Sequence, residues 1–272
     1  MYICDIRVLF IKTWIKRPSR KRKCKLKKRN SILISVLYCP KNGNPSYGSN
    51  YDSLPKEGKD LGKAENWRPI TISSILCRTY TGLLENRLRK TTNLHQRQKG
   101  FVPGQGCAQN CLTLVGIIEQ FKITSGCVAV LDVAKAFETV PHAAIRQALE
   151  KAGAHEAIAI QIDNMYSQSS TELSLPSGIK QKIALKRGVK QGDPTSPTLF
   201  NIVLDPLIRK LQEIGRRQKH ACQGISVLAF ADDLVLVAKT ETGLQTLLNE
   251  TGEFFHRLDM ALSPGTLYPC AS

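Results

Sequence analysis

Two adjacent aspartates, Asp232 and Asp233, stand between the apolar runs ISVLAF and LVLVA in the C-terminal third of the sequence. An unpaired charge is costly to bury in a protein core, so these carboxylates must face solvent at a turn or neutralise something. Two short runs rich in Val, Leu and Ile, separated by two turn-forming residues, indicate a β-hairpin. Taken alone, the pattern fits a surface hairpin at least as well as a catalytic one.

A third carboxylate follows another apolar run. Residues 126–133, GCVAVLDV, form a short continuous apolar segment that predicts a buried strand, with Asp132 at its exit. A helix is predicted next, because Pro141 suits a first helical position and Gly153 suits a stop. The sequence therefore predicts a strand with an acidic end, followed by a helix.

Further along the chain, TELSLPSGIKQKIALKRG alternates around a Pro-Ser-Gly turn, which predicts a hairpin over residues 171–188. Helical spacing of apolar residues predicts two more helices, the second of them entered through Ser196 and Pro197. Their stripes are Leu76, Tyr80, Leu83 or Leu84, and Leu88 in the first, and Leu199, Val203, Leu207, Leu211 and Ile214 in the second. This order of elements predicts an α+β fold, an antiparallel sheet covered by helices on one face.

Charge is concentrated at the N-terminus. Residues 1–31 hold twelve Lys and Arg and one Asp, which leaves about +6 of the total net charge of +17 for the rest of the chain. Such a run repels itself, so it is expected to be extended and either to bind polyanions, to direct nuclear import, or to be a solvated tail without function. The nine cysteines lack zinc-finger spacing and are expected to be reduced thiols, and no membrane span is expected.

The strand ending at Asp132 and the hairpin carrying Asp232 could be neighbours in one sheet, which would gather three carboxylates. Such a cluster is tolerated only with cations, and Mg²⁺ prefers one or two carboxylates together with substrate phosphates. Two such ions can clamp the attacking and leaving oxygens of a phosphoryl transfer. The carboxylates therefore predict a two-metal site for nucleotide chemistry.

Five blocks occur in order along the sequence: NWRPITI, QKGFVPGQGCAQN, LDVAKAF, RGVKQGDPTSPTLFNIVLDPL and FADD. Together they resemble the reverse transcriptase domain of non-LTR retrotransposons, and most of all the elements that insert into ribosomal RNA genes. The resemblance covers residues 54–264. It implies a right-hand polymerase with fingers and palm, the antiparallel palm sheet being packed on helices.

The chain is expected to divide into segments. Charge and a stretch rich in Gly, Pro, Asn and Ser indicate a basic tail at 1–32 and a linker at 33–54, and the resemblance implies a fingers-like region at 55–124 and a palm at 125–263. Residues 264–272 would be a divergent tail, with Thr266 and Leu267 where the family has a Lys followed by a Cys. The chain is expected to end before the thumb.

The resemblance also assigns roles to single residues. Asp132 and Asp232 would ligate two Mg²⁺ ions, with the Val133 carbonyl completing one shell and Asp233 contributing less. Phe137 matches the steric gate, whose ring would exclude a ribose 2′-OH, although a Phe in this position can equally be a core residue.

Four more residues match nucleotide-binding positions of the family. Gln191 and Gly192 would contact the incoming nucleotide and the templating base, since Gly allows close approach of the backbone. Arg68 and Lys56 would hold the triphosphate, which suits a guanidinium fork and a point charge.

The expected function is therefore RNA-directed DNA polymerisation, with an RNA template, a DNA primer and deoxynucleoside triphosphates as partners, in the nucleus. One alternative is a catalytically weak or silent truncated copy that only binds nucleic acid. Another is an RNA-directed RNA polymerase, which has no use for a bulky Phe137. The sequence does not fix the oligomeric state.

Overall fold

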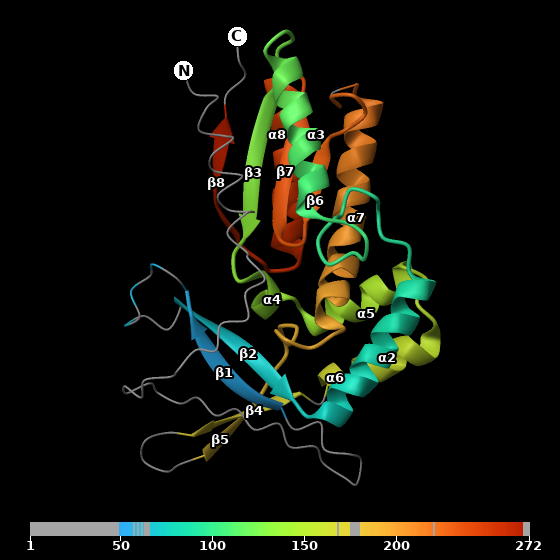
Figure 1. Cartoon of the computed structure of the whole chain (residues 1–272), viewed down its shortest axis with the longest axis vertical. Helices are drawn as coiled ribbons and strands as arrows, with labels where there is room; N and C mark the ends of the chain where they lie inside the picture. The colour runs from blue at the N-terminus through green and yellow to red at the C-terminus, as the bar shows by residue number, and fades with distance from the viewer. Residues whose placement is uncertain are drawn as a thin grey trace.

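The computed structural model of the chain is shown in Figure 1. The residues it describes are 49–56, 58, 60, 62, 66–167, 169–174, 180–219 and 221–268. The basic tail predicted at 1–32 lies outside them, as do most of the linker predicted at 33–54 and the Pro-Ser-Gly turn predicted at 176–178.

The described part of the chain has a mixed α+β architecture, as predicted. The strands are β1 (Ser49–Pro55), β2 (Trp67–Ser73), β3 (Cys127–Val133), β4 (Ser170–Ser174), β5 (Lys180–Ala184), β6 (Val227–Phe230), β7 (Asp233–Ala238) and β8 (Leu262–Tyr268). The helices are α2 (Ile75–Thr91), α3 (Cys107–Phe121), α4 (Ala136–Thr139), α5 (His142–Lys151), α6 (Glu156–Ser167), α7 (Ser196–Arg217) and α8 (Glu241–Arg257).

The central sheet has four antiparallel strands in the order β6-β7-β3-β8. It contains the buried strand and the hairpin that the sequence predicts, although these segments are about a hundred residues apart. In Figure 1 this sheet occupies one end of the molecule, and the β1–β2 and β4–β5 hairpins lie at the other end, with α4 between them. The sheet thus brings Asp132 and the hairpin of Asp232 to the same edge.

Helices cover both faces of the sheet, whereas the sequence predicted cover on one. Alternate residues of β3 divide between two cores: Ala129 and Leu131 join the core built by α7 and α8, and Val128 packs with Leu114 and Ile117 of α3. Side chains alternate along a strand, so β3 can contribute to both cores. The second covering helix was missed because the sequence predicted no helix over residues 107–121.

The α7 helix is the centre of the larger core. Four of its five predicted core residues, Leu199, Val203, Leu207 and Leu211, are buried, and Ile214 is half-buried against the same core. The helix begins at Ser196 after the N-cap residue Thr195, with Pro197 in its first turn, close to the predicted entry. Proline is tolerated there because the first amides of a helix lack intrahelical acceptors.

The buried stripe of α2 differs from the prediction. Its buried residues are Cys77, Thr81, Leu84, Glu85 and Leu88, whereas Leu76 and Leu83 are exposed. Leu84 and Leu88 fit either register of a helical stripe, so spacing alone did not select the face. Glu85 is tolerated in the buried stripe because Thr198 donates a 2.6 Å hydrogen bond to it and Arg89 forms an ion pair with it.

Two segment boundaries differ from those expected. β1 begins at Ser49, inside the predicted linker, and β8 continues the central sheet to Tyr268, past the predicted palm end at 263. Among the described cysteines, Cys77, Cys107, Cys111 and Cys222 are free thiols, as expected. Cys127 is disulfide-bonded, so that expectation is wrong for this residue. No helix in the described ranges has the length and apolar character needed to cross a bilayer.

Candidate active site

The three predicted carboxylates lie together at one end of the central sheet. Asp132 on β3 is the cross-strand partner of Asp233, the first residue of β7. Both occupy strand positions in phase with Val128 and Val235, so they share the α3 face of the sheet. Asp132 is exposed and Asp233 is half-buried. Two acidic side chains are therefore neighbours at the strand ends.

The turn of the hairpin is one residue earlier than predicted. Phe230 pairs with Asp233, so the two loop residues are Ala231 and Asp232, and Asp233 already belongs to the strand. Ala231 has the left-handed φ of 56° that a two-residue hairpin requires. Asp232 is half-buried at the tip, and the side chain of Val133 is buried, so only the backbone of Val133 could take part in a site.

The carboxylates at the strand ends suit a hard divalent cation whose remaining ligands would come from the substrate. No group of three or more His, Cys, Asp or Glu residues within the described ranges is placed to hold a metal ion by itself. Mg²⁺, however, is usually held by one or two carboxylates plus substrate phosphates. The pairing of Asp132 with Asp233 provides such a carboxylate pair.

Phe137 lies on α4, directly beyond the end of β3. Its ring stacks on Phe200 with a centroid distance of 5.2 Å and an interplanar angle of 11°, and it meets Phe101 edge-on at 6.2 Å. The side chain is half-buried and packs against the larger core. The structure thus gives Phe137 a core contact while part of the residue stays exposed.

Gln191 and Gly192 lie in the loop that precedes α7. The carbonyl oxygen of Gln191 accepts a 2.6 Å hydrogen bond from the backbone N–H of Thr71 on β2. Gly192 has φ 107°, and a Cβ there would lie 2.7 Å from the Thr71 carbonyl oxygen, so only glycine allows this approach. The Gln191 side chain donates to a Glu138 carboxylate oxygen at 3.4 Å.

Arg68 and Lys56 come from the β1–β2 hairpin. Arg68 is exposed on β2 opposite Leu54, and Lys56 is half-buried immediately after β1, where its backbone N–H donates to Asn66 at 2.8 Å. The hydrogen bond between Thr71 and Gln191 joins this hairpin to the loop before α7. The two predicted triphosphate contacts are therefore on an element attached to the Gln191 loop.

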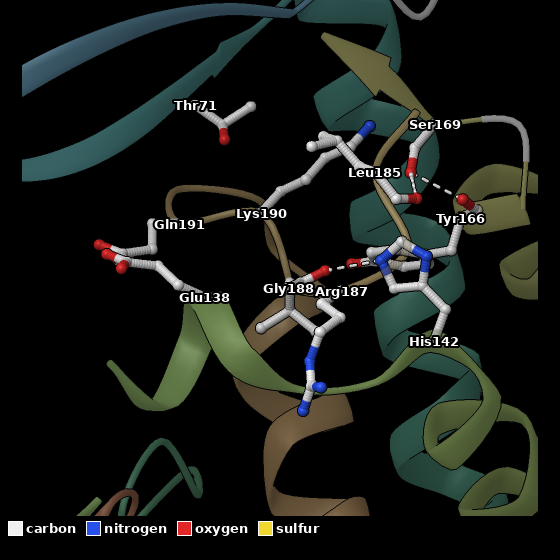
Figure 2. Close-up of a pocket in the computed structure, with 11 residues that line it drawn as sticks. Thr71, Glu138, His142, Tyr166, Ser169, Leu185, Arg187, Gly188, Lys190 and Gln191 are labelled. Atoms are coloured by element: carbon white, nitrogen blue, oxygen red, sulfur yellow. Dashed lines mark hydrogen bonds between the residues drawn. The ribbon is translucent and has the colours of Figure 1, made fainter. Parts of the chain in front are cut away.

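A cavity of about 190 Å³ lies beside this junction, lined by Thr71, Glu138, His142, Tyr166, Ser169, Leu185 and residues 187–191. Figure 2 shows Gln191 and Glu138 pointing the same way, while Arg187 turns away from the cavity. The ring of His142 is hydrogen-bonded to the Gly188 carbonyl at 3.0 Å, and burial is the main cause that lowers its pKa. Burial also lowers the pKa of Lys190, and the nearby Asp193 carboxylate partly offsets this.

Several residues around the site were not assigned a role from sequence. Gln98 and Asn110 bind the backbone of the Asp232 hairpin, and both lie in the block QKGFVPGQGCAQN. Glu138 follows Phe137 and contacts Gln191. Gln98 and Asn110 lie inside one of the resembling blocks and Glu138 directly follows another. No periodicity or spacing rule distinguishes a buried amide that supports a turn from an exposed one.

An antiparallel sheet with carboxylates at one end, a covering helix on each face and a fingers-like hairpin is the architecture of a polymerase palm. Residues 54–265 match the family described as reverse transcriptase (RNA-dependent DNA polymerase). The chain belongs to the reverse transcriptase family.

Curated relatives point to retrotransposons. The chain is 42% identical over 216 residues to a retrovirus-related Pol polyprotein from the retrotransposable element R2 of Popillia japonica, covering 77% of this chain and 30% of that protein. It is 39% identical over 205 residues to the corresponding polyprotein of element R2DM of Drosophila melanogaster, covering 74% of this chain and 19% of that protein. The chain thus spans less than a third of the length of either relative.

Solved structures of telomerase share the fold. A truncated telomerase from Candida tropicalis aligns with a TM-score of 0.59 at 12% identity, covering 82% of this chain and 50% of that chain. A telomerase from Candida albicans, solved in complex with a fragment of telomeric RNA, aligns with a TM-score of 0.57 at 10% identity, covering 97% of this chain and 45% of that one. At such identities the similarity concerns the fold alone.

Proposed function

We propose that this chain is the polymerase domain of a retrotransposon protein and adds deoxynucleotides to a DNA 3′-OH opposite an RNA template. The observation that carries the proposal is the pairing of Asp132 with Asp233, with Asp232 in the adjoining turn, in a chain of the reverse transcriptase family. Carboxylates so placed at a sheet edge suit Mg²⁺ and substrate phosphates.

Asp132 and Asp232 would hold two Mg²⁺ ions, with the Val133 carbonyl as a further ligand and Asp233 as a lesser contributor. When bound, such ions neutralise the phosphates and stabilise the charge that develops on the attacking and leaving oxygens. The protein's own contribution is to fix the carboxylates on two hydrogen-bonded strands, so that little reorganisation is needed when substrate arrives.

The nucleotide would lie between the carboxylate edge and the β1–β2 hairpin. Arg68 and Lys56 supply positive charge for the triphosphate, since a guanidinium pairs with phosphate oxygens through two parallel hydrogen bonds. Gln191 and Gly192 would meet the base pair that forms, and the ring of Phe137 would lie beside the sugar. The hydrogen bond from Thr71 to Gln191 joins the two elements that carry these residues, which supports the proposal.

The test is primer extension on an RNA template by Asp132→Asn and Asp232→Asn variants. Each should abolish Mg²⁺-dependent extension, a larger loss than the roughly 10- to 100-fold that removal of an outer-shell partner costs. RNA binding should be nearly unchanged, because the carboxylates hold metal and not template. Asp163→Asn, a half-buried aspartate on α6, is the matched control. Robust extension by either active-site variant would overturn the assignment.

A weakly active or silent nucleic-acid binder is the second candidate. It is favoured by Thr266 and Leu267, which stand on β8 opposite Val130 and Ala129, where the resemblance calls for a Lys followed by a Cys. A general acid near the leaving group typically contributes about 10²- to 10⁴-fold. Under this second candidate the wild-type chain binds primed RNA without extending it.

A further inference from the structure

The turn that carries Asp232 is held by a side chain more than a hundred residues earlier in the chain. Gln98 is only 2% exposed. Its side-chain oxygen accepts hydrogen bonds from the backbone N–H groups of Ala231 and Gly100, both at 2.8 Å. Its amide nitrogen lies 3.4 Å from the Ala231 carbonyl oxygen, to which it donates. One buried carboxamide thus binds both polar groups of the residue before Asp232.

Ala231 needs this support. Its φ of 56° is left-handed, a conformation that a residue with a Cβ adopts at a cost. Cross-strand pairing of the hairpin ends at Phe230 and Asp233, so the peptide groups of the two loop residues lie outside the ladder. A buried backbone N–H without a partner is also costly, and Gln98 removes that cost at Ala231.

Neighbouring contacts fix Gln98 itself in place. Gly100 lies so near the turn that a Cβ there would be 2.2 Å from the Ala231 nitrogen. The Asn201 amide donates to the Gly100 carbonyl oxygen at 2.8 Å, and the Asn110 amide donates to Ala229 at 2.9 Å. The first bond connects the segment of Gln98 to α7, and the second connects β6 to α3. The Gln98 amide is therefore part of a buried polar support with few other positions available to it.

We propose that Gln98 is a positioning residue for the Asp232 carboxylate: it fixes the left-handed Ala231 so that the following side chain is aimed at the Asp132 edge. This inference rests on the proposed function, in which Asp232 is a metal ligand. Gln98 does not touch metal or nucleotide; it acts through the backbone of Ala231. Without the hydrogen bonds of Gln98, the turn would change conformation and the Asp232 carboxylate would be held less firmly toward Asp132.

The experiment compares Gln98→Met, which keeps the length of the side chain and removes its hydrogen bonds, with Gln96→Met on the exposed side of the same segment. Mn²⁺ binding is measured by electron paramagnetic resonance, and backbone amide exchange across residues 229–234 by hydrogen–deuterium exchange. Gln98→Met should bind Mn²⁺ about 10- to 100-fold more weakly, the range seen when outer-shell partners of a metal site are removed. Exchange at Ala231 should accelerate, and the Mg²⁺ concentration for half-maximal extension should rise with little change in the KM for deoxynucleotide.

A second variant guards against a general folding defect. Gln98→Glu keeps an acceptor for both N–H groups, so it should hold the protection of the Ala231 amide near that of the wild type. If Gln98→Met matches the wild type in Mn²⁺ binding and in Ala231 exchange while Asp232→Asn loses Mn²⁺, the inference about Gln98 is overturned and the proposed function stands. If Asp132→Asn and Asp232→Asn both retain Mn²⁺ binding, the proposed function fails, and the positioning role fails with it.

Discussion

Phe137 combines packing against the core with partial exposure of its side chain. Its face is stacked on Phe200 and its edge meets Phe101, yet the ring is only half-buried. Packing on one side fixes the ring in one orientation, and a fixed ring excludes a substrate atom more sharply than a mobile one. The core role and the steric-gate role that the sequence left as alternatives are therefore compatible.

We expect Phe137→Val to raise ribonucleotide incorporation relative to deoxyribonucleotide incorporation, because the smaller side chain opens space beside the 2′ position. It should also lower the free energy of unfolding by about 1–3 kcal/mol, since it removes part of a ring packed on the core. Single-nucleotide incorporation and urea unfolding measure the two effects. Phe254→Val on α8, also half-buried against the core, should reduce stability without changing sugar selection. An unchanged ratio of sugars in Phe137→Val would leave this residue with its core role alone.

The two adjacent aspartates can also be distinguished. We expect Asp233→Asn to retain more extension activity than Asp232→Asn, because adjacent residues at a strand end tend to point to different sides. The register gives Asp233 a place opposite Asp132 that sequence reasoning did not anticipate. Steady-state extension rates of the two variants, measured at equal Mg²⁺ concentration, test this expectation. Equal loss would mean that the cross-strand position contributes as much to metal binding as the turn.

At the scale of elements, α5 holds the loop before α7 through His142. The imidazole is hydrogen-bonded to the Gly188 carbonyl, lies edge-on to Tyr166 at 5.0 Å, and is half-buried. Burial and the Lys190 cation lower the pKa of His142, while the backbone contacts and Asp163 partly oppose that shift. The unfolded chain therefore takes up a proton at a higher pH than the folded one. The stability that follows is present above about pH 6.5 and is lost as the pH falls below it.

Replacing His142 by Gln, which keeps an N–H donor for Gly188 but does not titrate, should make the unfolding free energy less dependent on pH below about 6.5. Urea unfolding at a series of pH values from neutral to mildly acid measures the slope. His155→Gln, at the exposed start of α6, is the control. If His142→Gln keeps the full acid slope of the wild type, the imidazole does not titrate differently in the folded and unfolded chains.

Elements also show where sequence reasoning succeeds. The strand ending at Asp132, both hairpins and α7 were predicted, because alternation, continuous apolar runs and a long helical stripe are local signals. The stripe of α2 was confirmed in part, since Leu84 and Leu88 are buried and Tyr80 packs against the core while Leu76 and the alternative Leu83 are exposed. The α3 helix was not predicted at all. The Asp132–Asp233 register and the Gln98 support arise from pairing between distant segments, which depends on tertiary packing and not on spacing.

At the scale of the whole molecule, a few long-range polar contacts around the loop before α7 connect segments that are distant in sequence. Arg187 donates to the Thr139 carbonyl at 3.0 Å, to the Leu258 and Asp259 carbonyls at 2.7 and 2.6 Å, and forms an ion pair with the Asp259 carboxylate. It thus connects the end of α4 to the turn between α8 and β8. Together with the hydrogen bond from Thr71 to Gln191, these contacts link the β1–β2 hairpin, the loop before α7 and the turn between α8 and β8.

The net charge of the chain is unevenly distributed along its sequence. Most of the net charge of +17 lies in residues 1–31, outside the described residues, so its effect must be read from binding and not from geometry. We expect deletion of residues 1–31 to flatten the salt dependence of RNA affinity, since each phosphate contact with single-stranded RNA adds about 0.7 to the slope of log affinity against log salt.

The slope is measured by fluorescence anisotropy of a labelled RNA over a range of salt concentrations. A matched variant replaces the twelve Lys and Arg of this segment by Gln and keeps its length, so it separates charge from chain length. Both variants should lose the same part of the slope, and extension of a saturating primer–template should be unchanged because the carboxylate edge and the Gln191 loop are intact. If deletion leaves the slope at the wild-type value, the phosphate contacts belong to the folded domain, whose own excess charge of about +6 must then supply them.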